Sequence, residues 1–171
     1  MIGRFHYLGY TPASGAQLRY LVTASPNRPI AAISFAASAW ALEDRDTWIG
    51  WDREQRKARL QLIVGNPRFS VAPPVRVAHL ASHLLGTITA RLRADWQDRY
   101  GYQPALVETL VEAGRHRSTC YQAAKPTRVG QTNRRGKLDR YNAYALPVKD
   151  IYLYPLVRSF RRQLTAPLHP S

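Results

Sequence analysis

The chain has 171 residues, of which 45% are hydrophobic and 11% aromatic, and this composition favours one folded globular domain over a disordered chain. No apolar run approaches the roughly 18 residues of a membrane span, no signal-peptide pattern opens the sequence, and the single Cys excludes an intramolecular disulfide framework. We therefore expect a cytoplasmic protein that does not enter a membrane. The formal net charge is +14, and residues 113–171 hold 12 Lys and Arg against 2 Asp and Glu, which favours a polyanionic partner such as nucleic acid.

The first third of the sequence predicts short strands followed by a helix. The expected strands lie at residues 5–10, 17–23 and 30–35. In the second of them apolar residues alternate from Leu18 to Val22, so one face is buried. The Ala-rich stretch 36–42 suits the start of a helix, and residues 48–51 suit a strand end or a turn. Asp52 is a suitable cap for a polar helix over residues 53–60.

The clearest helix lies in the middle of the chain. Apolar residues recur at helical spacing from Leu80 to Leu92, so a helix is expected from Val77 to about Arg99. A strand precedes it at residues 68–72, after an interruption at residues 65–67. After the helix we expect a buried strand at 105–111, a short helix at 119–124, and strands at 127–131 and 148–156.

This order of elements predicts an α/β (α+β) fold with a single mixed, mostly antiparallel sheet and helices on both faces. One domain is expected over residues 1–158. The remaining segment, residues 159–171, is basic and contains Pro, so we expect it to be partly disordered.

A carboxylate within an apolar run is the first indication of chemistry. Glu108 interrupts a strand that is otherwise apolar from Ala105 to Val111. Burial disfavours the charged form of a carboxyl group and so suits it to proton transfer near neutral pH. Glu108 is therefore a candidate general base, and pairing with one of the many Arg residues is the alternative. Tyr121 is a candidate acid or phosphate-binding residue, unless it is a core Tyr, and Asp46 is a candidate catalytic residue that would position a substrate.

The start of the long helix is a second candidate site. A helix N-terminus presents free backbone N–H groups and a partial positive charge, which suit a phosphate group. Arg68 precedes this helix and His79 and Ser82 open it, so these three are the candidate cofactor-binding residues. His79 and His83 lie four residues apart, but no third ligand stands near them in sequence, so no metal site is predicted.

Basic residues interleaved with aromatic ones are typical of proteins that bind single-stranded nucleic acid. The candidates in the second half are Arg115, Arg117, Arg128, Arg134, Arg135 and Lys137, with Tyr141 and Tyr144 beside them. In the first half, Arg45 and Trp51 are further candidates, because a Trp ring can stack on a base. An ordinary solvated face, with the Trp residues in the core, is the alternative.

Several short blocks occur in one order over roughly residues 5–156, nearly the whole chain. They are Phe5-His6-Tyr7-Leu8-Gly9, Leu18-Arg19-Tyr20, Arg45-Asp46, Ile49-Gly50-Trp51, Asn66 with Arg68-Phe69, Leu80-Ala81-Ser82, Asp95-Trp96, Tyr100-Gly101, Glu108-Thr109, Thr119-Cys120-Tyr121, Ala123-Ala124, and Gly130 with Thr132. This series resembles the DruA-like family, whose members occur in the Druantia anti-phage system and beside, or fused to, transposase-like proteins. The resemblance implies protein partners from a defence or mobile-element system.

The order of elements also resembles the GNAT acetyltransferase fold. In that fold a strand leads into a phosphate-binding helix start, the next strand splays away, and the acyl chain of the cofactor lies in the gap. The resemblance implies that residues 77–82 form the pyrophosphate loop and that Tyr121 is the general acid. The glycine-rich loop of the fold is absent, since residues 77–82 contain no Gly. The resemblance thus implies an acyl-CoA-type donor, but because the loop is absent the identity of the cofactor is left open.

Two functions fit these observations. The chain is either a GNAT-like transferase that modifies a nucleic-acid base or another polyanionic acceptor, or a DNA- or RNA-binding module without catalysis. A third interpretation, an adaptor for another protein, would require a large exposed apolar patch.

Overall fold

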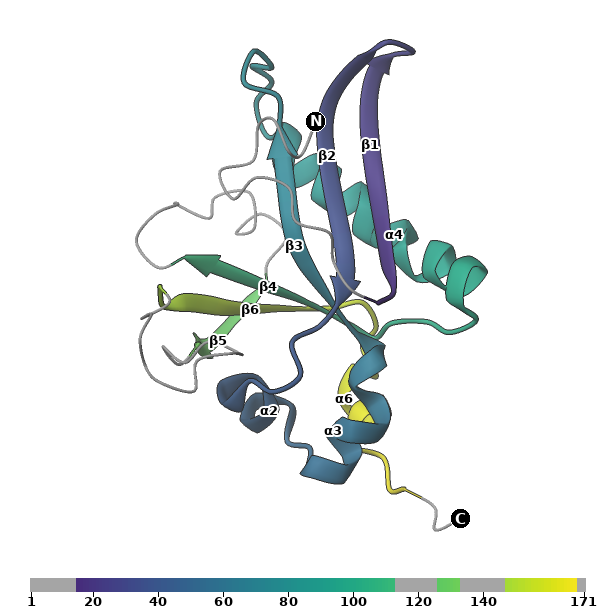
Figure 1. The fold of residues 1–171 in the computed structure, drawn as a ribbon, viewed down its shortest axis with the longest axis vertical. Coiled ribbons are helices and arrows are strands. Elements are labelled where there is room, and N and C mark those ends of the chain that lie inside the picture. The colour runs from purple at the N-terminus through teal and green to yellow at the C-terminus, as the bar shows by residue number, and fades with distance from the viewer. Residues whose placement is uncertain (1–14, 113–125, 133–146, 169–171) are drawn as a thin grey trace.

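The computed structural model describes residues 15–112, 126–132 and 147–168, and a six-stranded sheet forms the centre of the fold (Figure 1). The strands are β1 (Gln17–Ser25), β2 (Arg28–Ala37), β3 (Ile63–Val71), β4 (Leu106–Glu112), β5 (Thr127–Gln131) and β6 (Lys149–Pro155). The helices of the described residues are α2 (Glu43–Ile49), α3 (Arg53–Arg59), α4 (Leu80–Tyr100) and α6 (Phe160–Thr165), with a 3-10 turn η1 (Leu60–Leu62) after α3.

The sheet is mixed, as predicted. Its strand order is β1-β2-β3-β4-β6-β5, and β3 and β4 are parallel while the other neighbouring pairs are antiparallel. Val64 and Val107 pack in a core with residues of α4, whereas Ile63 and Leu106 pack in a second core with residues of α2 and α6. Because neighbouring residues of a strand point to opposite faces, the two cores lie on opposite faces, and the prediction of helices on both faces is confirmed.

Local signals fix the ends of two helices. Asp52 Oδ1 accepts a hydrogen bond from Gln55 N at 2.7 Å, and Gln55 Oε1 accepts one from Asp52 N at 3.0 Å, so α3 begins with a capping box. The predicted cap at Asp52 is therefore confirmed. At the end of α4, Gly101 has a φ of 78° and donates its N–H to Gln97 O at 2.8 Å, as a left-handed C-cap does.

Two expectations for residues 36–51 were wrong. Ala36 and Ala37 end β2 rather than starting a helix, and α2 begins only at Glu43. Small residues fit this central strand because both of its faces are covered, and such packing overrides helix propensity. Residues 48–49 belong to α2 instead of a strand end or turn, and Gly50 caps that helix with a φ of 82°.

The expected interruption at residues 65–67 is a β-bulge within a continuous strand. The β2–β3 register shifts between the pairs Ser34–Arg68 and Ala36–Gly65. A bulge accommodates Pro67, which has no N–H to donate to a ladder. Further along, α4 starts at Leu80 and not at Val77.

Part of the C-terminal segment that we expected to be partly disordered is helical. Residues 160–165 form α6, and Leu164 is fully buried in the second core. Gln55 and Arg59 of α3 donate hydrogen bonds to the carbonyl oxygens at the end of α6 and just beyond it. The basic composition of the segment concealed this packing.

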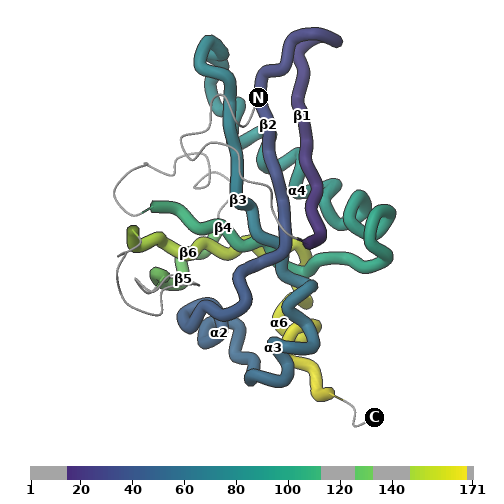
Figure 2. Tube along the Cα trace, in the orientation of Figure 1, coloured from purple at the N-terminus to yellow at the C-terminus, as the bar shows by residue number. Residues whose placement is uncertain are grey.

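The sheet opens in its middle. β3 and β4 pair over only three positions, Ile63–Leu106, Val64–Val107 and Gly65–Glu108, although β3 continues to Val71 and β4 to Glu112. Beyond Gly65 and Glu108 the two strands diverge strongly, so the sheet consists of two halves that meet at a short seam (Figure 2).

Candidate active-site cleft

A cleft of about 260 Å³ lies where β3 and β4 diverge. Its polar lining residues come from four parts of the chain: Ser38 after β2, Asn66 and Arg68 on β3, Glu108 on β4, and Lys149 on β6. The pair Gly65–Glu108 marks its narrow end, because this pair is the last of the parallel ladder. Arg68 and Lys149 lie toward its wide end, where Lys149 pairs in register with Glu112.

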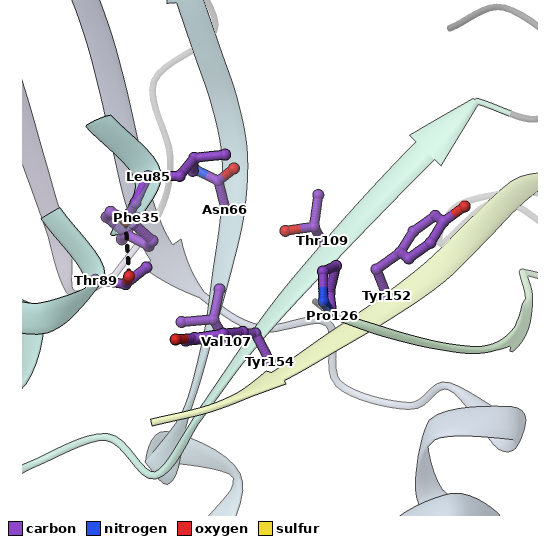
Figure 3. A pocket seen from close by; sticks show the side chains of 9 residues that line it. All are labelled: Phe35, Asn66, Leu85, Thr89, Val107, Thr109, Pro126, Tyr152 and Tyr154. Carbon is purple, nitrogen blue, oxygen red and sulfur yellow. Dashed lines mark hydrogen bonds between the residues drawn. The ribbon is translucent and has the colours of Figure 1, made fainter. Parts of the chain in front are cut away.

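A second hollow lies on the opposite face of the same divergence (Figure 3). Asn66 lines both spaces, whereas Val107 and Thr109 line this one and Glu108 lines the other, as alternation along a strand requires. Its walls are mainly apolar and include Leu85 of α4. It encloses about 20 Å³, which is room for about one water molecule.

Glu108 lies in the cleft wall, and its carboxylate is held by three donors. Arg45 Nη1 donates to Glu108 Oε2 at 2.8 Å, while Ser38 Oγ and Ala39 N donate to Oε1 at 3.0 and 3.4 Å. Arg45 is 0% exposed and Glu108 2%. A buried charge is tolerated only when it is paired and hydrogen-bonded, and both conditions are met here. The pairing with Arg that the sequence left open is therefore present, within the wall of the cleft.

Asp46 connects this ion pair to α3. It accepts hydrogen bonds from Arg45 Nε at 2.9 Å, from Trp51 Nε1 at 3.0 Å and from Arg56 Nη1 at 2.7 Å. Among the described residues, those that line the cleft do not include Asp46. Its contacts therefore orient Arg45, and through Arg45 they hold Glu108.

Arg45 and Trp51, which we expected to contact nucleic acid, lie in the interior instead. Arg45 is fully buried and Trp51 is only 7% exposed. Arg45 donates a hydrogen bond to Glu108, and Trp51 packs in the second core with Ile49 and Leu164. The segment that contains Arg45 and Trp51 therefore contributes an ion pair and core packing.

The predicted cofactor-binding residues separate in space. Arg68 lines the cleft, whereas His79 and Ser82, at the start of α4, line neither of the two spaces. His79 is exposed, has a φ of 56° and makes no side-chain cap. Arg68 and Glu108 thus line the same cleft, whereas His79 and Ser82 do not line it.

Of the nucleic-acid-binding residues predicted in the second half of the chain, Arg128 alone lies within the described residues, and it forms an ion pair with Asp150. Its guanidinium donates to Asp150 Oδ1 at 2.6 and 2.9 Å, and Gln131 Nε2 donates to the same oxygen. Although burial opposes ionisation, these hydrogen bonds hold the pKa of Asp150 below its ordinary value. Six further candidates lie outside the described residues: Tyr121, Arg115, Arg117, Arg134, Arg135 and Lys137.

Two absences can be stated for the described ranges. Within residues 15–112, 126–132 and 147–168, no three His, Cys, Asp or Glu side chains come together as a metal site would require. None of the helices in these ranges is both long and apolar enough to cross a membrane.

The family described as Druantia protein DruA matches residues 1–146 of the sequence. The chain belongs to the DruA family. Druantia is an anti-phage system, so this DruA-family chain is a protein of phage defence. The resemblance stated from the sequence motifs is confirmed. No curated protein matches the sequence.

Solved acetyltransferase structures share the fold of this DruA-family chain. The Escherichia coli ribosomal-protein-S18-alanine N-acetyltransferase aligns with a TM-score of 0.51 at 12% identity, over 90% of this chain and 81% of that one. A chimera of the Vibrio cholerae spermidine N-acetyltransferase SpeG aligns with a TM-score of 0.50 at 8% identity, over 82% of this chain and 68% of that one. The fold is therefore GNAT-like, and at these identities the likeness establishes the fold alone.

Sequence reasoning missed two polar members of the DruA-family cleft, Ser38 and Lys149. Ser38 follows the buried strand β2 and belongs to no motif, and Lys149 opens a strand that is otherwise mostly apolar. Only the pairing of β4 with β6 and the position of the β2–α2 connection bring them to the cleft. The available signal was their place at strand ends, where functional side chains often lie.

Proposed function

We propose that this DruA-family chain is a nucleic-acid-associated transferase that accepts a base or another polar group of a polyanionic acceptor in the cleft between β3 and β4. The observation that carries the proposal is the cleft itself, which opens at the divergence of these strands with Glu108 at its narrow end. Pockets of this kind, with a few convergent polar groups in a concave site, are the usual place for substrate chemistry.

Glu108 is the proposed proton acceptor. Oε1 is the oxygen held by neutral donors, since Ser38 Oγ and Ala39 N bind it while Arg45 binds Oε2. A proton from the acceptor would therefore be taken at Oε1, after the Ser38 hydroxyl rotates away. Asp46 would act as a positioning residue through Arg45, and Tyr121 remains the proposed acid.

The residues present do not fit coenzyme A, the donor that the GNAT fold implies. Residues 77–82, which should cradle the pyrophosphate, contain no Gly, and the apolar hollow on the α4 face encloses only about 20 Å³. We therefore derive no step through that cofactor. The donor of the transferred group is to be identified from the mass increase in the experiment described below.

Charge supports nucleic acid as the acceptor or partner. The segments 113–125 and 133–146 each carry a formal charge of +3, and they join the described residues at the end of β4, after β5 and just before β6. Lys149 lines the wide end of the cleft and opens β6. Cations attract phosphates, and binding is favoured by counterion release.

The second candidate is a nucleic-acid-binding module without catalysis. It is favoured by one observation: both oxygens of Glu108 already accept hydrogen bonds from the protein. On this interpretation Glu108 and Arg45 only shape the cleft, which then grips its ligand without changing it.

Mass spectrometry distinguishes the two. DNA and RNA would be incubated with the protein and a small-molecule extract of cells, and digested nucleosides would be searched for a mass increase. We expect a new adduct with the wild type, none with Glu108→Gln, and an unchanged yield with Glu43→Gln, an exposed carboxylate at the start of α2 that does not line the cleft. Since Glu108→Gln removes one of the two carboxylates that pair with the buried Arg45, its thermal unfolding is measured as well. Absence of any adduct with the folded wild type would favour the non-catalytic module.

A further inference from the structure

Trp40 is the exposed tryptophan of this chain. The chain has four Trp residues, and three are packed: Trp51 and Trp96 are buried, and the Trp48 ring stacks on Phe160 at a centroid distance of 5.4 Å. Trp40 is 56% exposed. A large aromatic surface left in water is unusual, and such residues are often binding residues.

The protein holds the backbone of Trp40 in place. Arg45 Nη1 donates to Ala39 O at 2.7 Å and Arg45 Nη2 donates to Trp40 O at 3.4 Å. Arg45 is itself fixed by Glu108 and Asp46. The exposed ring is therefore carried on an anchored segment, which reduces the entropy lost when a ligand packs on it.

One cation lies against this ring, and two more lie on the same face of its helix. The Arg56 guanidinium lies over the Trp40 ring, with Cζ 5.8 Å from its centroid, and Arg56 is fixed by Asp46. Arg53 and Lys57 lie three residues before and one residue after Arg56, so all three share one face of α3. Arg53 and Lys57 are exposed and make no hydrogen bond or ion pair with any described residue. One acid, Glu54, lies on the flank of that face.

We infer that Trp40 and the Arg53, Arg56 and Lys57 face of α3 form a binding surface for single-stranded nucleic acid. One unpaired base would stack on the Trp40 ring, and neighbouring phosphates would contact Arg53 and Lys57. Stacking requires a base whose face is open, which a duplex does not offer, so the surface selects single strands. Because Ala39 lines the cleft, a strand held on Trp40 lies one residue from the cleft wall.

This inference rests on the nucleic-acid part of the proposed function and not on catalysis. It also revises the prediction from sequence. The stacking residue assigned there was Trp51, which is buried, and the basic residues assigned there do not include α3.

Fluorescence anisotropy of a labelled single-stranded oligonucleotide, DNA and RNA in parallel, tests the surface. Loss of one stacked base is worth a factor of roughly 5 to 150 in affinity. We expect Trp40→Ala to weaken single-strand binding by a factor in this range, Trp40→Phe to retain most of it, and Leu21→Ala to have no effect. Leu21 is the matched control, since it is 61% exposed and lies in β1.

The cations are tested by the salt dependence of binding. Each phosphate contact to a single strand adds about 0.7 to the slope of log K against log salt. We expect Arg53→Gln/Lys57→Gln to lower the slope by up to about 1.4. The control is Arg158→Gln/Arg162→Gln, which removes the same charge from exposed positions at and before α6.

The outcomes separate the two proposals. If wild type binds no oligonucleotide, the nucleic-acid part of the proposed function fails together with this surface. If wild type binds and Trp40→Ala, with unchanged thermal unfolding, binds equally well, only this surface is overturned. Equal losses on a single strand and its duplex would refute stacking. Binding to phosphatidylglycerol vesicles that depends on Trp40, without binding to oligonucleotides, would assign the surface to a membrane and overturn the inference.

Discussion

The buried ion pair between Arg45 and Glu108 gives the sharpest test of the structure. Replacing Arg45 leaves Glu108 charged, buried and without its ion-pair partner, which typically destabilises a protein by about 3–5 kcal/mol. Replacing Glu108 should cost less, because Arg45 keeps its ion pair with Asp46. For a chain of this length each kcal/mol lowers the melting temperature by about 2–4 °C, so Arg45→Met should lower it by about 6–20 °C and Glu108→Leu by less. The double variant removes both charges, and we expect it to unfold at a higher temperature than Arg45→Met.

The assay is a double-mutant cycle measured by urea denaturation. We expect a coupling free energy of about 2 kcal/mol or more, because the two side chains touch at 2.8 Å and are only 0% and 2% exposed. The control is the surface pair Arg128 and Asp150, whose side chains are 50% and 20% exposed and whose coupling should stay below about 1 kcal/mol. Additive effects of Arg45→Met and Glu108→Leu, within about 0.5 kcal/mol, would refute the buried pair.

Three further predictions concern the rest of the fold. Gly130→Ala should destabilise by about 1–3 kcal/mol, because a Cβ there would stand 1.7 Å from Asp44 Oδ2 and 2.4 Å from Asp44 Cβ, and Asp44→Ala, which keeps the Cβ, should relieve only part of the effect in a urea titration. The hydrogen bonds from Arg91, which outweigh burial, hold the pKa of Asp95 below its ordinary value of 3.8. The stabilising contribution of Asp95 is therefore present above that value and is lost as the pH falls through the lower folded-state pKa. Asp95→Asn should lack this loss of stability at acid pH, and an unchanged pH dependence of acid unfolding would contradict the assignment. Leu164→Ala should cost about 2–5 kcal/mol in calorimetry, whereas a loss below 1 kcal/mol would mean that α6 does not pack as described.

Elements whose signal is local could be predicted from the sequence. The alternation from Leu18 to Val22 and the helical spacing from Leu80 to Leu92 each mark one buried face, and both elements are present. Asp52 could be assigned as a cap because a capping box is a contact between residues three apart. The order of elements along the chain carried the resemblance to the GNAT fold, and that fold is confirmed.

The site was less predictable because its contacts are distant in sequence. Arg45 and Glu108 are 63 residues apart, so no local pattern could show that they neutralise each other. Ala36 and Ala37 have high helix propensity, and only their place at the end of a central strand makes them part of β2. Similarly, exposure decides which Trp can bind a ligand, and exposure depends on packing that adjacent residues do not encode.

The connection between β2 and β3 has a consequence for how the chain folds. α2 lies between these two strands in sequence, yet Ile49 packs with Leu153 of β6, and Asp44 accepts a hydrogen bond from Gln131 N at the end of β5. The amino-terminal half of the sheet therefore contributes a helix to the core of the carboxyl-terminal half. Neither half can complete its interior alone, so a polypeptide ending within residues 101–105 should stay unfolded, and in native-state hydrogen exchange the amides of β2 and β6 should open together in one cooperative event.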